Sequence, residues 1–311
     1  MRFPGPTHHT LFCNSRSSAY KLIVLLSEKL ANDGLSLQKH KTRILTSDEF
    51  ADINRLLDPH SLNDPAASEE QKLLHISIRF DPYSATAAED YEALKSAVQE
   101  VDIIGILSRE LANTTVDQAV AKQAINALKA LDPQLQEKAL GILLDKENLL
   151  TLAPVFITVM RAVRGIYLDL SNAAMDHVDD ALLDLYASGS YLLSVDLNLS
   201  YYIQALSIRH SDKKETTLVA IFDKTEAHYI RRQIILTMAR WERHYWLTDV
   251  KRRFKSYTEW ERRAIIVASY RLGDEGKHWR DHNKDLMGRA ETVVRDWIAD
   301  RAQNHRLDGV A

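Results

Sequence analysis

Tyr229-Ile-Arg-Arg-Gln-Ile-Ile-Leu and Trp260-Glu-Arg-Arg-Ala-Ile-Ile-Val are two similar stretches that begin 31 residues apart, at 229 and 260. Both carry two arginines and two isoleucines at matching positions, and Arg240 and Arg271 extend the match. A period of about 30 to 45 residues is typical of helix pairs that stack into a solenoid. The two stretches therefore predict a helical repeat, with a weaker third copy at 122–125. Chance similarity between amphipathic helices is the alternative.

The rest of the sequence is also typical of a helical protein. Of its 311 residues, 10 are Gly and 7 are Pro, about half of the usual share or less. So few helix-breaking residues favour long helices, and apolar periodicity places them along most of the chain. The expected helices cover residues 87–111, 115–131, 133–145, 147–163, 171–187, 190–208, 214–224, 226–241, 247–256, 258–272 and 284–302.

Composition excludes several classes of protein. Forty basic residues against 43 acidic ones leave a net charge of −3, so the overall charge does not favour a nucleic-acid or membrane partner. Cys13 is the single cysteine, which excludes a disulfide framework and fits a reducing compartment. The sequence shows no export signal and no apolar stretch long enough to span a bilayer. We therefore expect a cytoplasmic protein without membrane contact.

Composition and residue pattern divide the chain into three parts. Residues 1–57 combine a strand end at 11–13, an amphipathic helix at 18–31 and a small hairpin, which predicts an α+β domain. Residues 58–90 read as a polar loop followed by one strand, and the helical repeat domain covers 91–311. The expected fold class is mainly α, with a small α+β region followed by a solenoid.

Two segments carry a resemblance to a known family. Phe12-Cys13-Asn14-Ser15, the following helix, Gly34-Leu35-Ser36-Leu37 and Lys41-Thr42 resemble the palm segment after the Tyr-x-Asp-Asp hairpin of bacterial reverse transcriptases. Phe80-Asp81-Pro82-Tyr83-Ser84 looks like the abortive-infection and phage-defence groups of that family, which carry HEAT-like helical repeats after the polymerase core. The resemblance implies an RNA-directed DNA polymerase in which a palm and thumb remnant precedes a HEAT-like solenoid.

The residues that bind the catalytic metals in that family are missing. The two aspartates of its Tyr-x-Asp-Asp box should fall at Thr7 and His8, and no upstream palm or fingers supply the third. Two Mg²⁺ ions need clustered carboxylate oxygens, and His8 and His9 are poor replacements. We therefore expect a truncated or partial reverse transcriptase that is inactive alone and has no cofactor of its own, although the complete family enzyme uses Mg²⁺.

Lys41 is the catalytic residue that the resemblance implies. The family's lysine at this position lies near the incoming triphosphate, where an ammonium group offsets charge on the leaving pyrophosphate. A solvated turn lysine beside Lys39 and Arg43 is the alternative interpretation.

A basic, aromatic-rich block extends from 231 to 263. Ten cations and four acids give it a net charge of +6, and six aromatic side chains lie among them. Cations neutralise phosphates and aromatic faces stack unpaired bases, so the block favours RNA or single-stranded DNA as a partner. Aromatic packing between repeats, with the arginines on a solvated face, is the alternative. The predicted nucleic-acid-binding residues are Arg231, Arg232, Arg243, Lys251, Arg252, Arg253, Lys255, Trp260, Arg262 and Arg263.

The remaining charged clusters predict no metal site. Asp176, Asp179 and Asp180 share a helical face and more simply form a solvated face or pair with the arginines of the block. His278 and His282 lack a third ligand. The missing polymerase half is a further expected partner. A non-enzymatic helical scaffold that binds a protein along its concave face, and a decayed fragment, are the alternative functions.

Overall fold

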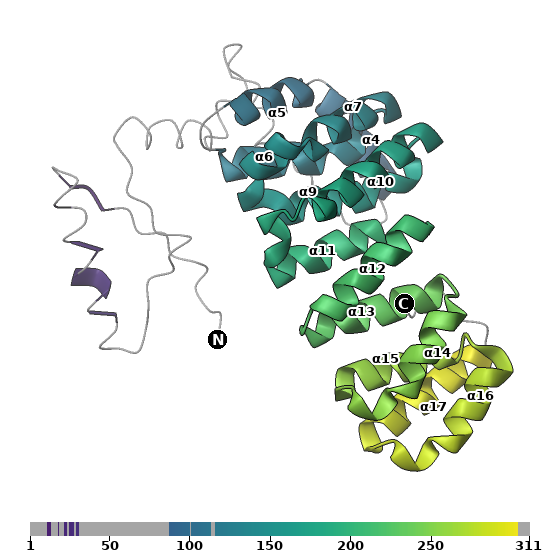
Figure 1. Ribbon diagram of the computed structural model, residues 1–311. Coiled ribbons are helices and arrows are strands. Elements are labelled where there is room, and N and C mark those ends of the chain that lie inside the picture. The colour runs from purple at the N-terminus through teal and green to yellow at the C-terminus, as the bar shows by residue number, and fades with distance from the viewer. Residues whose placement is uncertain are drawn as a thin grey trace. The chain divides into compact units, whose positions relative to one another are not determined.

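The computed structural model describes residues 87–99, 101–112 and 116–303, with scattered residues between 11 and 30 (Figure 1). The chain divides into two compact units, Met1–Ala67 and Ser68–Ala311. The described part contains helices and no strand, so the prediction of a mainly α protein is confirmed. The hairpin and most of the α+β region predicted over 1–57 lie outside the described residues. Leu11–Cys13, which we predicted as a strand end, lie outside any strand.

The second unit is a succession of helices joined by short turns, several of them 3₁₀ (Figure 1). The helices are α4 (Ala87–Gln99), α5 (Ile103–Ala112), α6 (Gln118–Ala127), α7 (Pro133–Leu144), α8 (Lys146–Thr151), α9 (Phe156–Ile166), α10 (Asn172–Ala187), α11 (Asp196–Leu206), α12 (Asp212–Lys224), α13 (His228–Arg240), α14 (His244–Arg252), α15 (Glu259–Ser269), α16 (Gly273–His282) and α17 (Arg289–Gln303).

Two of the predicted helices are each broken in two. The helix predicted at 87–111 ends at Gln99, and α5 starts anew because Asp102 Oδ1 accepts a hydrogen bond of 2.9 Å from the Gly105 amide. The helix predicted at 147–163 breaks at a 3₁₀ turn around Pro154, which has no N–H to donate within a helix. In both places a local side chain ends the helix, although the apolar spacing continues through it.

The sequence analysis missed α16 because its glycines looked like breakers. Gly273 begins this helix with a φ of +55°, a left-handed conformation that suits glycine. Gly276 is buried, and a Cβ atom there would lie 1.8 Å from the carbonyl oxygen of Ser269. The second glycine therefore allows α16 to approach the end of α15 closely.

Contacts between helices that are distant in sequence define two sets of helices. Helices α9, α11, α13, α15 and α17 pack side by side in that order, and α12, α14 and α16 contact the members of this set that adjoin them (Figure 1). Ile234 and Ile265 are 0% and 1% exposed, so the predicted apolar stripe is buried. One continuous hydrophobic core runs from Val98 to Leu272. No helix among the described residues is long and apolar enough to cross a membrane.

Candidate nucleic-acid interface

Several cations of the predicted block are already paired with carboxylates. Lys251 is only 5% exposed, and its Nζ lies 2.7 Å from Glu275 Oε1. The hydrogen bonds from Lys251 and then Thr248 lower the pKa of the Glu275 carboxyl. Arg252 is exposed, with its Nη1 3.1 Å from Asp249 Oδ1. A phosphate would have to displace these carboxylates, which weakens the case for Lys251 and Arg252 as ligand contacts.

Arg231 connects α13 to the start of α15. The Glu261 side chain is 1% exposed, and its Oε2 accepts hydrogen bonds from Thr258 N at 2.8 Å and Thr258 Oγ1 at 2.6 Å. The bond from Thr258 N belongs to a capping box at the N-terminus of α15, whose reciprocal bond runs from the Glu261 amide to the Thr258 side chain. The other oxygen, Oε1, lies 3.5 Å from Arg231 Nη1 on the preceding helix of the set. Arg231 therefore links neighbouring helices, and its guanidinium is already engaged by Glu261 and by the Phe222 carbonyl.

Arg262 repeats this arrangement one helix further on. Glu291 Oε2 accepts a hydrogen bond of 2.7 Å from the Gly288 amide at the start of α17. Its Oε1 lies 2.7 Å from Arg262 Nε on α15. We call each such arginine with its capping glutamate a joint. Sequence analysis missed Glu261 and Glu291, although their spacing of 30 residues was a usable signal.

The remaining residues of the block converge on a groove across α13, α15 and α17. Its volume is about 250 Å³. Trp260 and Trp297 line it and are 57% and 47% exposed. The Arg263 guanidinium carbon lies 5.0 Å from the centre of the Trp260 ring, and that of Arg301 lies 4.5 Å from the Trp297 ring. We call this the tryptophan groove; it is lined by Arg232, Leu236, Trp260, Arg263, Ala264, Val267, Val294 and Trp297.

The 31-residue period explains why these residues meet. Arg232, Arg263 and Val294 follow one another at that spacing on three successive helices of one set, so they occupy equivalent faces. Arg232 is exposed, and within the described residues no carboxylate oxygen lies within 4.0 Å of it. Arg263 Nη2 lies 2.8 Å from Glu259 Oε2. The groove therefore has one cation free for a ligand and one that is shared.

Other predicted residues lie elsewhere. Arg253 and Lys255 are exposed at the 3₁₀ turn that follows α14, with the Arg253 guanidinium carbon 5.8 Å from the centre of the Tyr257 ring. Neither residue lines the tryptophan groove. Trp297 and Arg301, by contrast, were missed because the predicted block ended at 263. Their spacing of four residues on one helix was the signal that could have revealed them.

Arg243 lies beside a group of potential metal ligands. His210, Asp212 and Glu215 bring one ligand atom each within 4.8 Å of one another. Arg243 Nη1 lies 3.5 Å from Glu215 Oε2, and His210 Nε2 lies 3.0 Å from the same oxygen. These residues adjoin the N-terminus of α12, where the helix dipole is positive. The guanidinium and the helix dipole offset part of the charge of the two carboxylates.

Of the acidic cluster predicted near 176, Asp179 is buried in a network whose cations lie outside the block, whereas Asp176 and Asp180 are exposed. Lys214 is 0% exposed, and its Nζ lies 2.5 Å from Asp179 Oδ1. The same oxygen accepts a hydrogen bond of 2.7 Å from the Tyr167 hydroxyl, while Arg209 Nη2 lies 2.9 Å from Asp179 Oδ2 and also pairs with Asp176. Burial lowers the pKa of Lys214, and burial followed by Asp179 raises the pKa of Tyr167. The network ties α10 to α12.

Lys41 lies outside the described residues. In comparisons with known proteins, no family model matches the chain, and no curated protein or solved structure matches it either. The resemblance to reverse transcriptases therefore rests on the residues quoted for it.

Proposed function

We propose that the helical unit binds single-stranded RNA or DNA in the tryptophan groove. The observation that carries this proposal is the pair of half-exposed indoles, Trp260 and Trp297, on adjacent helices. Base stacking on an aromatic side chain contributes about 1–3 kcal/mol per base. Arg232 and Arg301 supply positive charge beside the rings for the phosphates. Most other cations of the block are paired, so the groove is where stacking and charge coincide.

We further infer that α9 to α17 form a HEAT-like solenoid. The side-by-side packing of alternate helices supports this, as do the two joints, which repeat the same contacts. In such an array the equivalent faces of successive helices form a continuous surface. That surface would present the tryptophan groove to an extended strand.

The proposal also retains the polymerase relationship. On this view the chain is a partial RNA-directed DNA polymerase, located in the cytoplasm, in which Lys41 needs a complementing polymerase half to act. A primer-extension assay with Mg²⁺ tests it. The chain alone should incorporate no nucleotide, because no carboxylates stand at 7 and 8. Incorporation by the purified chain would contradict this part of the proposal.

Fluorescence anisotropy with a labelled single-stranded oligonucleotide tests the groove. Replacing both Trp260 and Trp297 by Ala should weaken binding about 30-fold or more, since two stacked bases are lost. Tyr245→Ala is the matched control, because Tyr245 is 95% exposed and lies outside the groove. Equal affinities for the control and the double variant would refute the proposal.

Charge is tested by a second pair of variants. Arg232→Glu should weaken binding and reduce its salt dependence. Arg252→Glu should do neither, because this exposed arginine lies outside the groove beside Asp249. Binding that does not change with salt would contradict phosphate contact.

A protein-binding scaffold is the second candidate function. It is favoured by the apolar side chains that line the groove beside the indoles, Leu236, Val267 and Val294 among them. It predicts a partner that co-purifies with the chain after nuclease treatment and is lost in the Trp260 and Trp297 double variant. In that case no affinity for oligonucleotides should be measured.

A further inference from the structure

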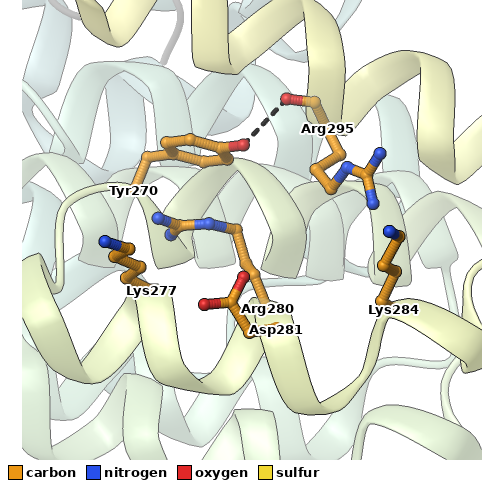
Figure 2. A pocket seen from close by; sticks show the side chains of 6 residues that line it. All are labelled: Tyr270, Lys277, Arg280, Asp281, Lys284 and Arg295. Atoms are coloured by element: carbon orange, nitrogen blue, oxygen red, sulfur yellow. Dashed lines mark hydrogen bonds between the residues drawn. The ribbon is translucent and has the colours of Figure 1, made fainter.

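A second pocket lies between the end of α15, α16, the turn that follows α16, and α17. Its volume is about 390 Å³, within the range of small-ligand sites. Figure 2 shows its side chains, and we call it the basic pocket. It shares no residue with the tryptophan groove and is lined by Tyr270, Lys277, Arg280, Asp281, Lys284 and Arg295.

Stacking and hydrogen bonds hold the centre of the basic pocket in place. The Arg280 guanidinium stacks on the Tyr270 ring, with its carbon 3.7 Å from the ring centre (Figure 2). Arg280 Nη1 donates hydrogen bonds to Ser269 O at 2.8 Å and to Ser269 Oγ at 3.1 Å. The Tyr270 hydroxyl donates in turn to Arg295 O at 2.9 Å, which fastens the ring to α17. Arg280 is therefore positioned before any ligand arrives.

The charge of the basic pocket is not balanced. Four of its six residues are cations and only Asp281 is acidic. Among the described residues, no carboxylate oxygen lies within 4.0 Å of Lys277, Arg280 or Lys284. Arg295 alone is paired, with its Nη2 2.7 Å from Asp296 Oδ1. Six of the ten cations of the 231–263 block lie within 4.0 Å of a carboxylate oxygen, so the basic pocket has the larger unpaired share.

Burial of the Arg280 guanidinium also favours binding of an anion. It lowers the pKa of Arg280, because desolvation penalises the charged guanidinium. The direct partners of that guanidinium are a carbonyl, a hydroxyl and an aromatic face, and the charge of the neighbouring Asp281 offsets the burial only in part. An anion in the pocket would supply the missing charge at short range.

We propose that the basic pocket binds a ligand with two or more linked phosphates. Lys277 and Lys284 lie on opposite sides of Arg280 (Figure 2), so the cations form a row and not a single point. A row of this kind matches adjacent phosphates, whereas a lone phosphate would contact only part of it. Asp281 offers a hydrogen-bond acceptor for a hydroxyl or amino group, which favours a nucleoside polyphosphate over bare pyrophosphate.

Isothermal titration calorimetry at low salt tests this with three probes. The full chain should bind inorganic pyrophosphate at least about tenfold more tightly than inorganic phosphate, because a second phosphate adds charge-assisted hydrogen bonds. It should bind adenosine triphosphate more tightly still. A heat of binding for neither polyphosphate, or equal affinities for phosphate and pyrophosphate, would overturn the proposal.

Matched lysine variants locate the site. Lys277→Ala with Lys284→Ala should weaken pyrophosphate binding by about tenfold for each lysine removed. Lys213→Ala with Lys255→Ala is the control, since these lysines are also exposed but lie outside the pocket. Equal effects of the two double variants would place the binding elsewhere and refute the assignment.

The same variants separate this inference from the proposed function. Oligonucleotides without a terminal phosphate should bind the Lys277 and Lys284 double variant as they bind the unmodified chain. An oligonucleotide with a 5′-triphosphate distinguishes a strand end from a free nucleotide as the source of the phosphates. If the 5′-triphosphate oligonucleotide binds but the free nucleotide does not, and its extra affinity is lost in the double variant, the pocket binds the linked phosphates of a strand end.

Discussion

Asp179→Asn should destabilise the protein severely, because it leaves the Lys214 ammonium group buried without a countercharge. Lys214 is 0% exposed, and its other polar contact is a hydrogen bond of 3.1 Å to a neutral carbonyl, Arg209 O. Removing one partner of a buried ion pair costs about 3–5 kcal/mol. The asparagine can still accept from the Tyr167 hydroxyl, and Arg209 loses one ion pair but keeps that with Asp176, so the loss comes mainly from Lys214. A loss of this size is a large part of a typical total of about 5–15 kcal/mol.

Urea unfolding followed by circular dichroism measures the effect. Asp176→Asn is the matched control, because Asp176 pairs with the same Arg209 but is 67% exposed. Its loss should stay within about 1 kcal/mol. Asp179→Leu combined with Lys214→Met should recover most of the stability, since an apolar pair of similar size removes the stranded charge.

The pH dependence provides a further check. Burial already lowers the pKa of Lys214, and loss of Asp179 lowers it further. Between the lowered folded value and the higher unfolded value, the unfolded state binds the extra proton, so stability rises with pH. The deficit of Asp179→Asn should therefore shrink in alkaline buffer. The reasoning fails if Asp179→Asn costs no more than Asp176→Asn.

Three other predictions concern stability. Gly276→Ala should lower the free energy of unfolding by about 1–3 kcal/mol, because the new Cβ would lie 1.8 Å from a carbonyl oxygen. Gly141→Ala should raise it by about 0.5–1 kcal/mol, because the Cβ there meets nothing within 4 Å. Thermal melting of both variants distinguishes these outcomes. Glu261→Ala should cost about 1–3 kcal/mol in urea unfolding, because it removes the carboxylate beside the partly buried Arg231 and uncaps α15; a loss below about 1 kcal/mol would contradict the joint. Burial raises the pKa of Tyr167 and Tyr202, so the stability they contribute is present below about pH 10 and is lost as pH rises above it; melting temperatures that do not fall between pH 9 and 11 would argue against this.

Apolar spacing along the sequence predicted the helices well where no other local signal interrupted it. Ile234 and Ile265 lie in the core as their spacing indicated, on α13 and α15, with α14 between these two helices. The pattern was wrong at α16, where Gly276 serves close packing and does not break a helix. A glycine has the same appearance in sequence in both roles, and only the neighbouring helix distinguishes them.

The candidate sites were harder to predict because charge pairing is a long-range property. Arg231 is paired with a glutamate 30 residues away, and Lys251 with one 24 residues away. Counting cations in the block could not separate these from Arg232, which has no carboxylate partner among the described residues. The basic pocket was missed for a related reason, since three separate segments contribute its side chains.

The joints would allow further repeats to be added to the proposed solenoid. Residues 260–290 carry an accepting glutamate near their beginning, Glu261, and a donating arginine beside it, Arg262. A tandem duplicate of this segment would receive the guanidinium of the original copy and offer its own to Glu291. In the proposed solenoid, genetic duplication of one unit would thus leave no buried charge without a partner at either boundary, so such an array would lengthen by whole units.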